Sequence, residues 1–175
     1  MTKPIFAYHI FGKGGYNMWN KIKPYVYSIA LTLAVGGLSA LLTAKNMNLY
    51  EKIKMPPLSP PSWLFPVVWT ILYVLMAVSF ARVYIKRKNA PRMRRNAIGI
   101  YSLNLFFNFF WSIIFFNCEA YLFSFIWLLA LLIIILIMFL NYYRTDAAAG
   151  FLLLPYIVWV TFAGYLNLAI YVFNK

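Results

Sequence analysis

Acidic residues are scarce in this chain of 175 residues, which contains three Asp and Glu residues together, one His and one Cys. The acids, Glu51, Glu119 and Asp146, all fall in loops or at the ends of apolar segments. Catalysis by paired carboxylates and a relay of buried acids are therefore not expected. The lone Cys118 excludes an internal disulfide and a cysteine-rich metal site. Because His9 lies in a polar N-terminal stretch, we expect no conventional enzyme, no metal site and no required cofactor.

Charged residues of both signs make up 11% of the chain, whereas 64% is hydrophobic and the mean hydropathy is +0.74. A soluble domain has about a quarter of its residues charged. Five apolar runs of about 20 residues or more can each cross a ~30 Å hydrocarbon layer. They cover residues 25–44, 63–85, 97–116, 121–143 and 151–173. The short gaps predict an all-α integral membrane domain, a five-transmembrane-helix bundle over residues 25–175, after a basic tail of residues 1–24.

The sixteen Lys and Arg residues give a formal net charge of +13, which would suit a nucleic-acid partner. The positions of these basic residues along the chain instead indicate the topology of a membrane protein. With five spans, twelve fall on one side, and Lys45, Lys52, Lys54 and Lys175 fall on the other. The positive-inside rule then predicts a cytoplasmic N-terminus and an external C-terminus. Because no targeting segment is recognisable, we expect the cell membrane as the location and no nucleic-acid partner.

Two Pro-Pro pairs, at residues 56–57 and 60–61, lie directly before the second apolar run. They predict a stiff, ordered loop, because proline fixes the backbone and lacks a donor. Ser62 is expected to cap the following helix, with Pro66 in its first turn. A simple membrane anchor does not need such a loop, whereas a loop held in a fixed place over a site does.

The third apolar run carries Asn104, Asn108, Trp111 and Ser112 at the spacing i, i+4, i+7, i+8, which places all four on one helix face. Asparagines in a membrane need partners. These two either hold neighbouring helices together or offer hydrogen bonds to a ligand. The first run instead gathers small residues at positions 36, 37, 39 and 40, which favour helix packing inside the monomer or at a dimer contact.

Two other runs carry a tryptophan on a helix face: Trp69 lies one turn before Tyr73, and Trp159 lies one turn before the small Ala163. Both tryptophans lie about two turns inside their helices, where an interfacial aromatic belt explains them poorly. Together with the asparagines they would line a pocket between the second, third and fifth helices. Such a pocket suits a flat, hydrophobic ligand with a few heteroatoms, such as a tetrapyrrole or a sterol. Packing of the rings against one another is the alternative.

Three blocks resemble the family of tryptophan-rich sensory proteins and translocator proteins (TspO/MBR). They are PPLSPPSWLFPVVWTILYVLMAVS at residues 56–79, NLFFNFFWSIIFF at 104–116 and LPYIVWVTFAGYLN at 154–167. The resemblance extends over about residues 25–173, with the helices in matching order. It implies a five-helix bundle, commonly a homodimer, whose pocket is closed by the loop of residues 45–62. It also implies binding of porphyrins such as protoporphyrin IX, of cholesterol-like lipids and of benzodiazepine-type drugs.

Carried over residue by residue, the resemblance implies that Trp69 and Trp159 are the pocket tryptophans. Asn104 and Asn108 match polar positions of the third helix, and Tyr50 matches the tyrosine that begins the lid loop. Bacterial relatives are reported to promote light-dependent breakdown of protoporphyrin IX. If this chain does so, the two tryptophans are the catalytic candidates.

The lid loop departs from the family pattern at Leu49, where many members have tryptophan, and at residues 55–58, which read Met-Pro-Pro-Leu. Fewer lid aromatics would weaken stacking or change the preferred ligand. Leu168 replaces the tyrosine of the animal cholesterol-recognition motif, so sterol binding is not predicted from that motif.

Three functions remain open for one pocket: tetrapyrrole or stress sensing, which leads, light-dependent porphyrin degradation, and transport of tetrapyrroles or sterols. Transport is disfavoured because the sequence shows no inverted repeat and no mid-membrane acid. The expected partners are a lipophilic small molecule and membrane lipids.

Overall fold

The computed structural model describes residues 14–46 and 53–175. Within these ranges five helices are long and apolar enough to cross a membrane, and no strand occurs. The long helices are α1 (Gly14–Thr43), α3 (Leu64–Lys86), α4 (Pro91–Ser112), α5 (Tyr121–Tyr143) and α7 (Leu154–Phe173). Three short elements accompany them: η1 (Ala44–Asn46), a π-helical turn η2 (Ile113–Asn117) and α6 (Ala147–Phe151). The prediction of an all-α, five-helix membrane bundle is confirmed.

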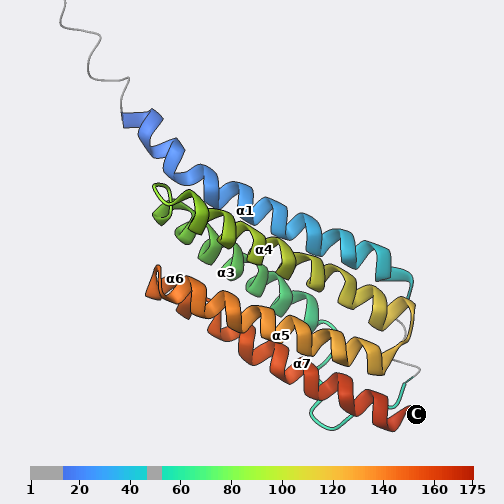
Figure 1. The fold of residues 1–175 in the computed structure, drawn as a ribbon. Helices are drawn as coiled ribbons and strands as arrows, with labels where there is room; N and C mark the ends of the chain where they lie inside the picture. Colours follow the sequence, from blue (N-terminus) through green and yellow to red (C-terminus); the bar gives the residue numbers. More distant parts are fainter. Residues whose placement is uncertain (1–13, 47–52) are drawn as a thin grey trace, which may run out of the picture.

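The five long helices lie alongside one another in a single bundle (Figure 1). α1 packs on α3 and α4, and α5 packs on α4 and α7. The α3–α4 connection and α6 lie at one end of the bundle, and the first turns of α1 project beyond that end (Figure 1). The α4–α5 connection and the C-terminus lie at the other end.

Side-chain hydroxyls join the helices inside the bundle. The Ser28 hydroxyl on α1 donates to the carbonyl of Ala77 on α3 at 3.0 Å, and the Ser79 hydroxyl on α3 donates to the carbonyl of Ala149 on α6 at 2.6 Å. Hydrocarbon offers polar groups no partners, so small hydroxyl residues are suited to contacts between membrane helices. Gly36 also lies at such a contact, where α1 meets the ring of Tyr73. The packing role predicted for the small residues thus holds at Gly36.

Several helix boundaries differ from the prediction. α1 begins at Gly14, not Tyr25, and contains Pro24, so the second half of the predicted tail is helical. α4 begins at Pro91, six residues before the predicted start, and the last span begins at Ala147 instead of Phe151. Proline is well suited to the first position of a helix. Hydropathy marks the part of a helix that lies in lipid, and these helices continue beyond that part into polar surroundings.

The prediction that Ser62 caps the second long helix is wrong. α3 begins at Leu64, and Trp63, already in helical conformation, precedes it without a side-chain cap. The amide of Leu64 donates to the carbonyl of Pro61 at 3.0 Å, so the backbone turns before the helix without using the serine side chain. Pro66 does lie in the first turn, as predicted.

The Pro-rich segment is tied to the far end of α7. The hydroxyl of Tyr165 donates to the carbonyl of Pro57 at 3.1 Å. The Asn174 side chain accepts from the amide of Lys54 at 2.8 Å and donates to its carbonyl at 3.0 Å. These contacts hold the segment against α7, although it leads into α3, in agreement with the predicted ordered loop.

A polar network joins the helices at the opposite end. Asp146 accepts from Arg82 at 2.7 Å and pairs with Lys86 at 3.1 Å. The hydrogen bond from Arg82, followed by that from Lys86, holds the pKa of this carboxyl below its usual value. The buried guanidinium of Arg87 donates to both oxygens of Asn141 at 2.8 Å, and burial lowers its pKa. The network fastens the ends of α3 and α5 to the start of α6.

Candidate ligand-binding site

A cavity of about 440 Å³ lies between α1, α3, α4 and the end of the Pro-rich segment. This volume falls within the range of about 300–1,000 Å³ found for small-molecule sites. Most of the lining is apolar or aromatic, with a few hydroxyl groups and one amide. The lining residues are Gly36, Ser39, Ala40, Thr43, Ser62, Trp63, Phe65, Pro66, Trp69, Tyr73, Asn108, Trp111, Ser112 and Phe116.

Trp69 is the hub of the aromatic rings in and behind this cavity. Its ring centroid lies 5.5 Å from that of Tyr73, 6.4 Å from that of Trp111 and 6.1 Å from that of Tyr156, which it meets edge to face. These separations are typical of favourable aromatic pairs. Contacts from α3, α4 and α7 therefore fix the indole of Trp69, and a flat ligand would meet a preformed surface.

Asn108 on α4 supplies the one amide side chain of the cavity lining. Asn108 is 3% exposed, and its Nδ2 donates to the backbone and side-chain oxygens of Asn104, both at 2.9 Å, and to the hydroxyl of Tyr156. Tyr156 in turn donates to Oδ1 of Asn104 at 3.3 Å. Within the described chain, Oδ1 of Asn108 has no hydrogen-bond partner. A buried acceptor without a partner costs about 1–3 kcal/mol, so a ligand that donates to it removes this cost, less the cost of desolvating its own donor.

The structure brings some of the predicted site residues together and separates others. Trp69, Tyr73, Asn108 and Trp111 line the cavity. Asn104 does not line it, although it holds the Asn108 amide in place from behind. Trp159 and Ala163 do not line it either, and Tyr50 lies outside the described residues.

Trp159 instead borders an apolar groove of about 630 Å³ between α3 and α7. Its ring meets Phe65 edge to face at 5.8 Å, and its Nε1 is buried without a hydrogen-bond partner in the described part of the chain. The two tryptophans singled out for porphyrin chemistry thus line different hollows. Tyr156, 1% exposed, contacts Trp69 from α7. The space between α3 and α7 is therefore filled at this level, and the cavity lies toward α1.

Sequence reasoning missed the contribution of α1 to the cavity. Gly36, Ser39, Ala40 and Thr43 line it, at the spacing i, i+3, i+4, i+7 that marks one helix face. The Ser39 hydroxyl donates to the carbonyl of Phe109 on α4 at 2.9 Å, so this face both packs and leaves room. The spacing was visible in the sequence, but small residues predict close packing and an open space equally well.

Comparison with known proteins agrees with the five-helix membrane fold. The model of the TspO/MBR family matches residues 28–172, a range that includes parts of all five long helices. "Tryptophan-rich protein TspO" of Chlorobaculum tepidum is 35% identical over 151 residues, which cover 83% of this chain and 92% of that protein. "Protein CrtK" of Rhodobacter capsulatus is 31% identical and covers 71% and 78%. "Translocator protein" of Bos taurus is 26% identical and covers 82% and 88%.

Proposed function

Because this chain belongs to the TspO/MBR family and is an integral, multi-pass membrane protein, we propose that it binds porphyrins, such as protoporphyrin IX, or related lipophilic molecules within the bundle. The proposed site is the cavity between α1, α3 and α4. The observation that carries the proposal is an aromatic cavity lined in part by Asn108, whose buried Oδ1 has no hydrogen-bond partner among the described residues. The proposed role is tetrapyrrole or stress sensing, with the N-terminus in the cytoplasm and the protein in the cell membrane.

The chemistry of the lining supports a large, flat ligand. The rings of Trp69, Trp111 and Phe116 offer stacking surface to a conjugated macrocycle. The hydroxyls of Ser62 and Ser112 can donate to carboxylate oxygens of a ligand. Oδ1 of Asn108 can accept from a propionic acid that is protonated inside the membrane. A sterol has a single hydroxyl and satisfies fewer of these groups.

Binding is tested by titrating the detergent-purified protein with protoporphyrin IX in the dark. The main absorption band of the porphyrin reports binding without depending on the protein's own tryptophans. We expect a saturable spectral shift for the wild type, and affinity up to about tenfold lower for Trp69→Phe, because an aromatic pair contributes about 0.5–1.5 kcal/mol and the smaller ring keeps part of it.

Trp159→Phe is the matched control, because Trp159 lines the groove on the other side of α3 and not the cavity. It should bind as the wild type does. A wild type without a saturable shift would overturn porphyrin binding. Equal losses in both variants would place the ligand elsewhere in the bundle. Illumination of the two loaded variants would then show whether either tryptophan is needed for light-dependent porphyrin degradation.

A further inference from the structure

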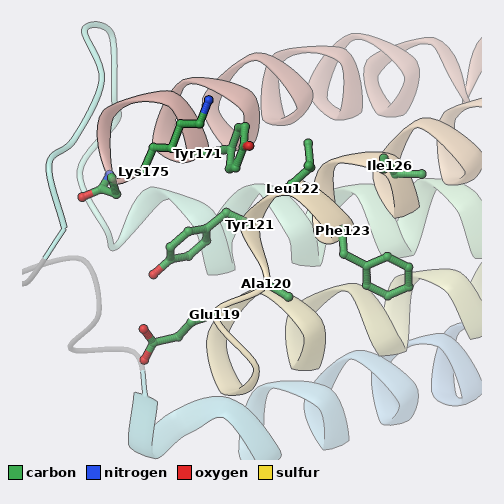
Figure 2. Close-up of a pocket in the computed structure, with 9 residues that line it drawn as sticks. Glu119, Ala120, Tyr121, Leu122, Phe123, Ile126, Tyr171 and Lys175 are labelled. Carbon is green, nitrogen blue, oxygen red and sulfur yellow. The ribbon is translucent and has the colours of Figure 1, made fainter.

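A second hollow, of about 530 Å³, lies at the C-terminal end of the bundle, where the start of α5 meets the end of α7 (Figure 2). Its lining differs from that of the cavity, with no residue in common. Charged, aromatic and aliphatic side chains alternate around it. The lining residues are Glu119, Ala120, Tyr121, Leu122, Phe123, Ile126, Tyr171, Asn174 and Lys175.

Charges of opposite sign flank this hollow without neutralising each other. Glu119 and Tyr121 lie on one side, and Tyr171 and Lys175 lie on the other (Figure 2). Nζ of Lys175 lies 5.7 Å from the ring centroid of Tyr171. Among the described residues, the two salt bridges both involve Asp146 at the opposite end of the bundle, so Glu119 and Lys175 form none. The hollow therefore has a carboxylate and an ammonium group in its lining, and the Tyr121 hydroxyl shares the carboxylate.

The frame of the hollow is fixed by the backbone. Glu119 has a φ of +49°, in the left-handed region that a residue with a side chain rarely adopts. The neighbouring amide of Ala120 donates to the carbonyl of Ile114 at 3.3 Å. On the other side, the bonds of Asn174 to Lys54 and to the carbonyl of Ile170 hold the end of α7. Glu119 therefore lies directly before an anchored amide, that of Ala120, and Lys175 lies directly after the anchored Asn174.

An apolar track leads from the charged rim along α5. Leu122, Phe123 and Ile126 are 43%, 52% and 53% exposed, and they occupy one face by their i, i+1, i+4 spacing. Because α5 is a membrane-crossing helix that begins at Tyr121, this track enters the hydrocarbon directly below the rim. A water-soluble zwitterion would leave it uncovered, whereas a lipid chain would cover it.

We propose that this hollow binds a phospholipid with a primary-amine headgroup, of the phosphatidylethanolamine type. Its ammonium group donates to the carboxylate of Glu119, and its phosphate accepts from Nζ of Lys175. One acyl chain lies along Leu122, Phe123 and Ile126. A quaternary choline headgroup keeps its positive charge but has no N–H to donate, so it loses the charge-assisted hydrogen bond to Glu119 and keeps the contact with Lys175.

Native mass spectrometry of the delipidated full-length protein tests this site. Phosphatidylethanolamine, phosphatidylcholine and phosphatidylglycerol with identical acyl chains are added in equal amounts, and bound lipid is counted. We expect the ethanolamine lipid to be retained about tenfold more than the choline lipid, as for one charge-assisted hydrogen bond. Glu119→Gln should remove this preference, and Lys175→Ala should reduce retention of both lipids.

Lys54→Ala is the matched control, because Lys54 is an exposed base at the same end whose hydrogen bonds to Asn174 are made by its backbone. It should keep the wild-type preference. Equal retention of ethanolamine and choline lipids by the wild type would overturn the proposal. Strongest retention of the glycerol lipid would also overturn it, because positive charge alone would then explain binding. Unchanged thermal unfolding of Glu119→Gln would show that a lost preference is not caused by misfolding.

Discussion

At the scale of single residues, Asn108 shows how one side chain can serve both the fold and a ligand. Its Nδ2 is fully used inside the bundle, on Asn104 and Tyr156, whereas its Oδ1 has no partner in the described chain. The interpretation of the paired asparagines as a helix contact is confirmed for Nδ2, and the ligand contact stays a prediction for Oδ1. The donor side fixes the orientation in which the acceptor side meets the cavity.

Replacing Asn108 by Leu is expected to weaken protoporphyrin IX binding about tenfold, because a hydrogen bond to a buried acceptor is lost. The dimethyl ester of the porphyrin has no acid O–H, so its affinity should be the same for variant and wild type. The absorption titration described above measures both. An equal loss for acid and ester would mean that the side chain acts through packing of the cavity and not through its oxygen.

Gly36 provides a test of the cavity wall formed by α1. A Cβ built at this position would lie 2.2 Å from Cε2 of Tyr73, so Gly36→Ala must displace the tyrosine ring, which also lines the cavity. We expect a loss of about 1–3 kcal/mol in the free energy of unfolding, as for other overpacked sites, and weaker porphyrin binding.

Gly37→Ala is the control for that change. Nothing lies within 4 Å of a Cβ built at Gly37. Alanine also favours helix by up to about 1 kcal/mol over glycine, so stability should be unchanged or slightly higher. Thermal unfolding in detergent and the porphyrin titration compare the two variants. Similar behaviour of both would show that α1 does not form a wall of the site.

At this scale the sequence predicted part of the site for a clear reason. Trp69 with Tyr73, and Asn108 with Trp111, each share a face of one helix, and helical periodicity alone establishes that. Placing Trp159 in the same cavity required knowledge of which helices face one another across it. Spacing within a helix does not contain that information. In the structure, the buried ring of Tyr156 fills the space between α3 and α7 and keeps Trp159 out of the cavity.

At the scale of elements, the helices are longer than their apolar runs. The first six residues of α4, 91–96, include three arginines that hydropathy places in a loop. Arg94 lies over the ring of Tyr84 on α3, 3.6 Å from its centroid, so a contact between neighbouring helices supports this polar turn. Hydropathy therefore predicts which residues lie in lipid, and polar contacts near the helix ends determine where the helices stop.

The ion pairs of Asp146 with Arg82 and Lys86, called here the Asp146 clamp, predict how stability changes at low pH. Because Arg82 lowers the pKa of Asp146, the folded state binds its proton more weakly than the unfolded chain does. The stabilisation is therefore present above the unfolded pKa of about 3.9 and is lost as the pH falls from there through the lower folded pKa. We expect the wild type to lose unfolding free energy from this group as the pH falls from about 4 toward 2.

The measurement is thermal unfolding at several pH values, with Asp146→Asn and Glu119→Gln beside the wild type. Asp146→Asn should be less stable than the wild type at pH 6 and should depend less on pH. Glu119→Gln should keep the wild-type dependence, because Glu119 forms no salt bridge among the described residues. The chain has three acids in all, so few other groups titrate in this range. The same pH dependence in wild type and Asp146→Asn would contradict the clamp.

At the scale of the whole molecule, the number of helices and their order could be predicted because lipid imposes a single length and a single hydrogen-bonding solution on each span. This lipid constraint does not specify which helices are neighbours in the bundle. α1 lies against both α3 and α4, and hydroxyl contacts such as that of Ser39 with Phe109 hold it there. The cavity exists because α1 has small residues where it packs on α3 and α4, and its position follows from the packing of these three helices.

The orientation of the whole bundle is tested by its single cysteine. Cys118 is exposed in the α4–α5 connection, and the exposed Lys88 lies in the α3–α4 connection at the opposite end. Since the excess of basic residues favours the cytoplasmic side for Lys88, a membrane-impermeant maleimide added to intact cells should label Cys118. Lys88→Cys in a Cys118→Ser background should be labelled only after the membrane is permeabilised. The reverse pattern would place the basic end outside, and with it the hollow beside Glu119 and Lys175 would face the cytoplasmic leaflet.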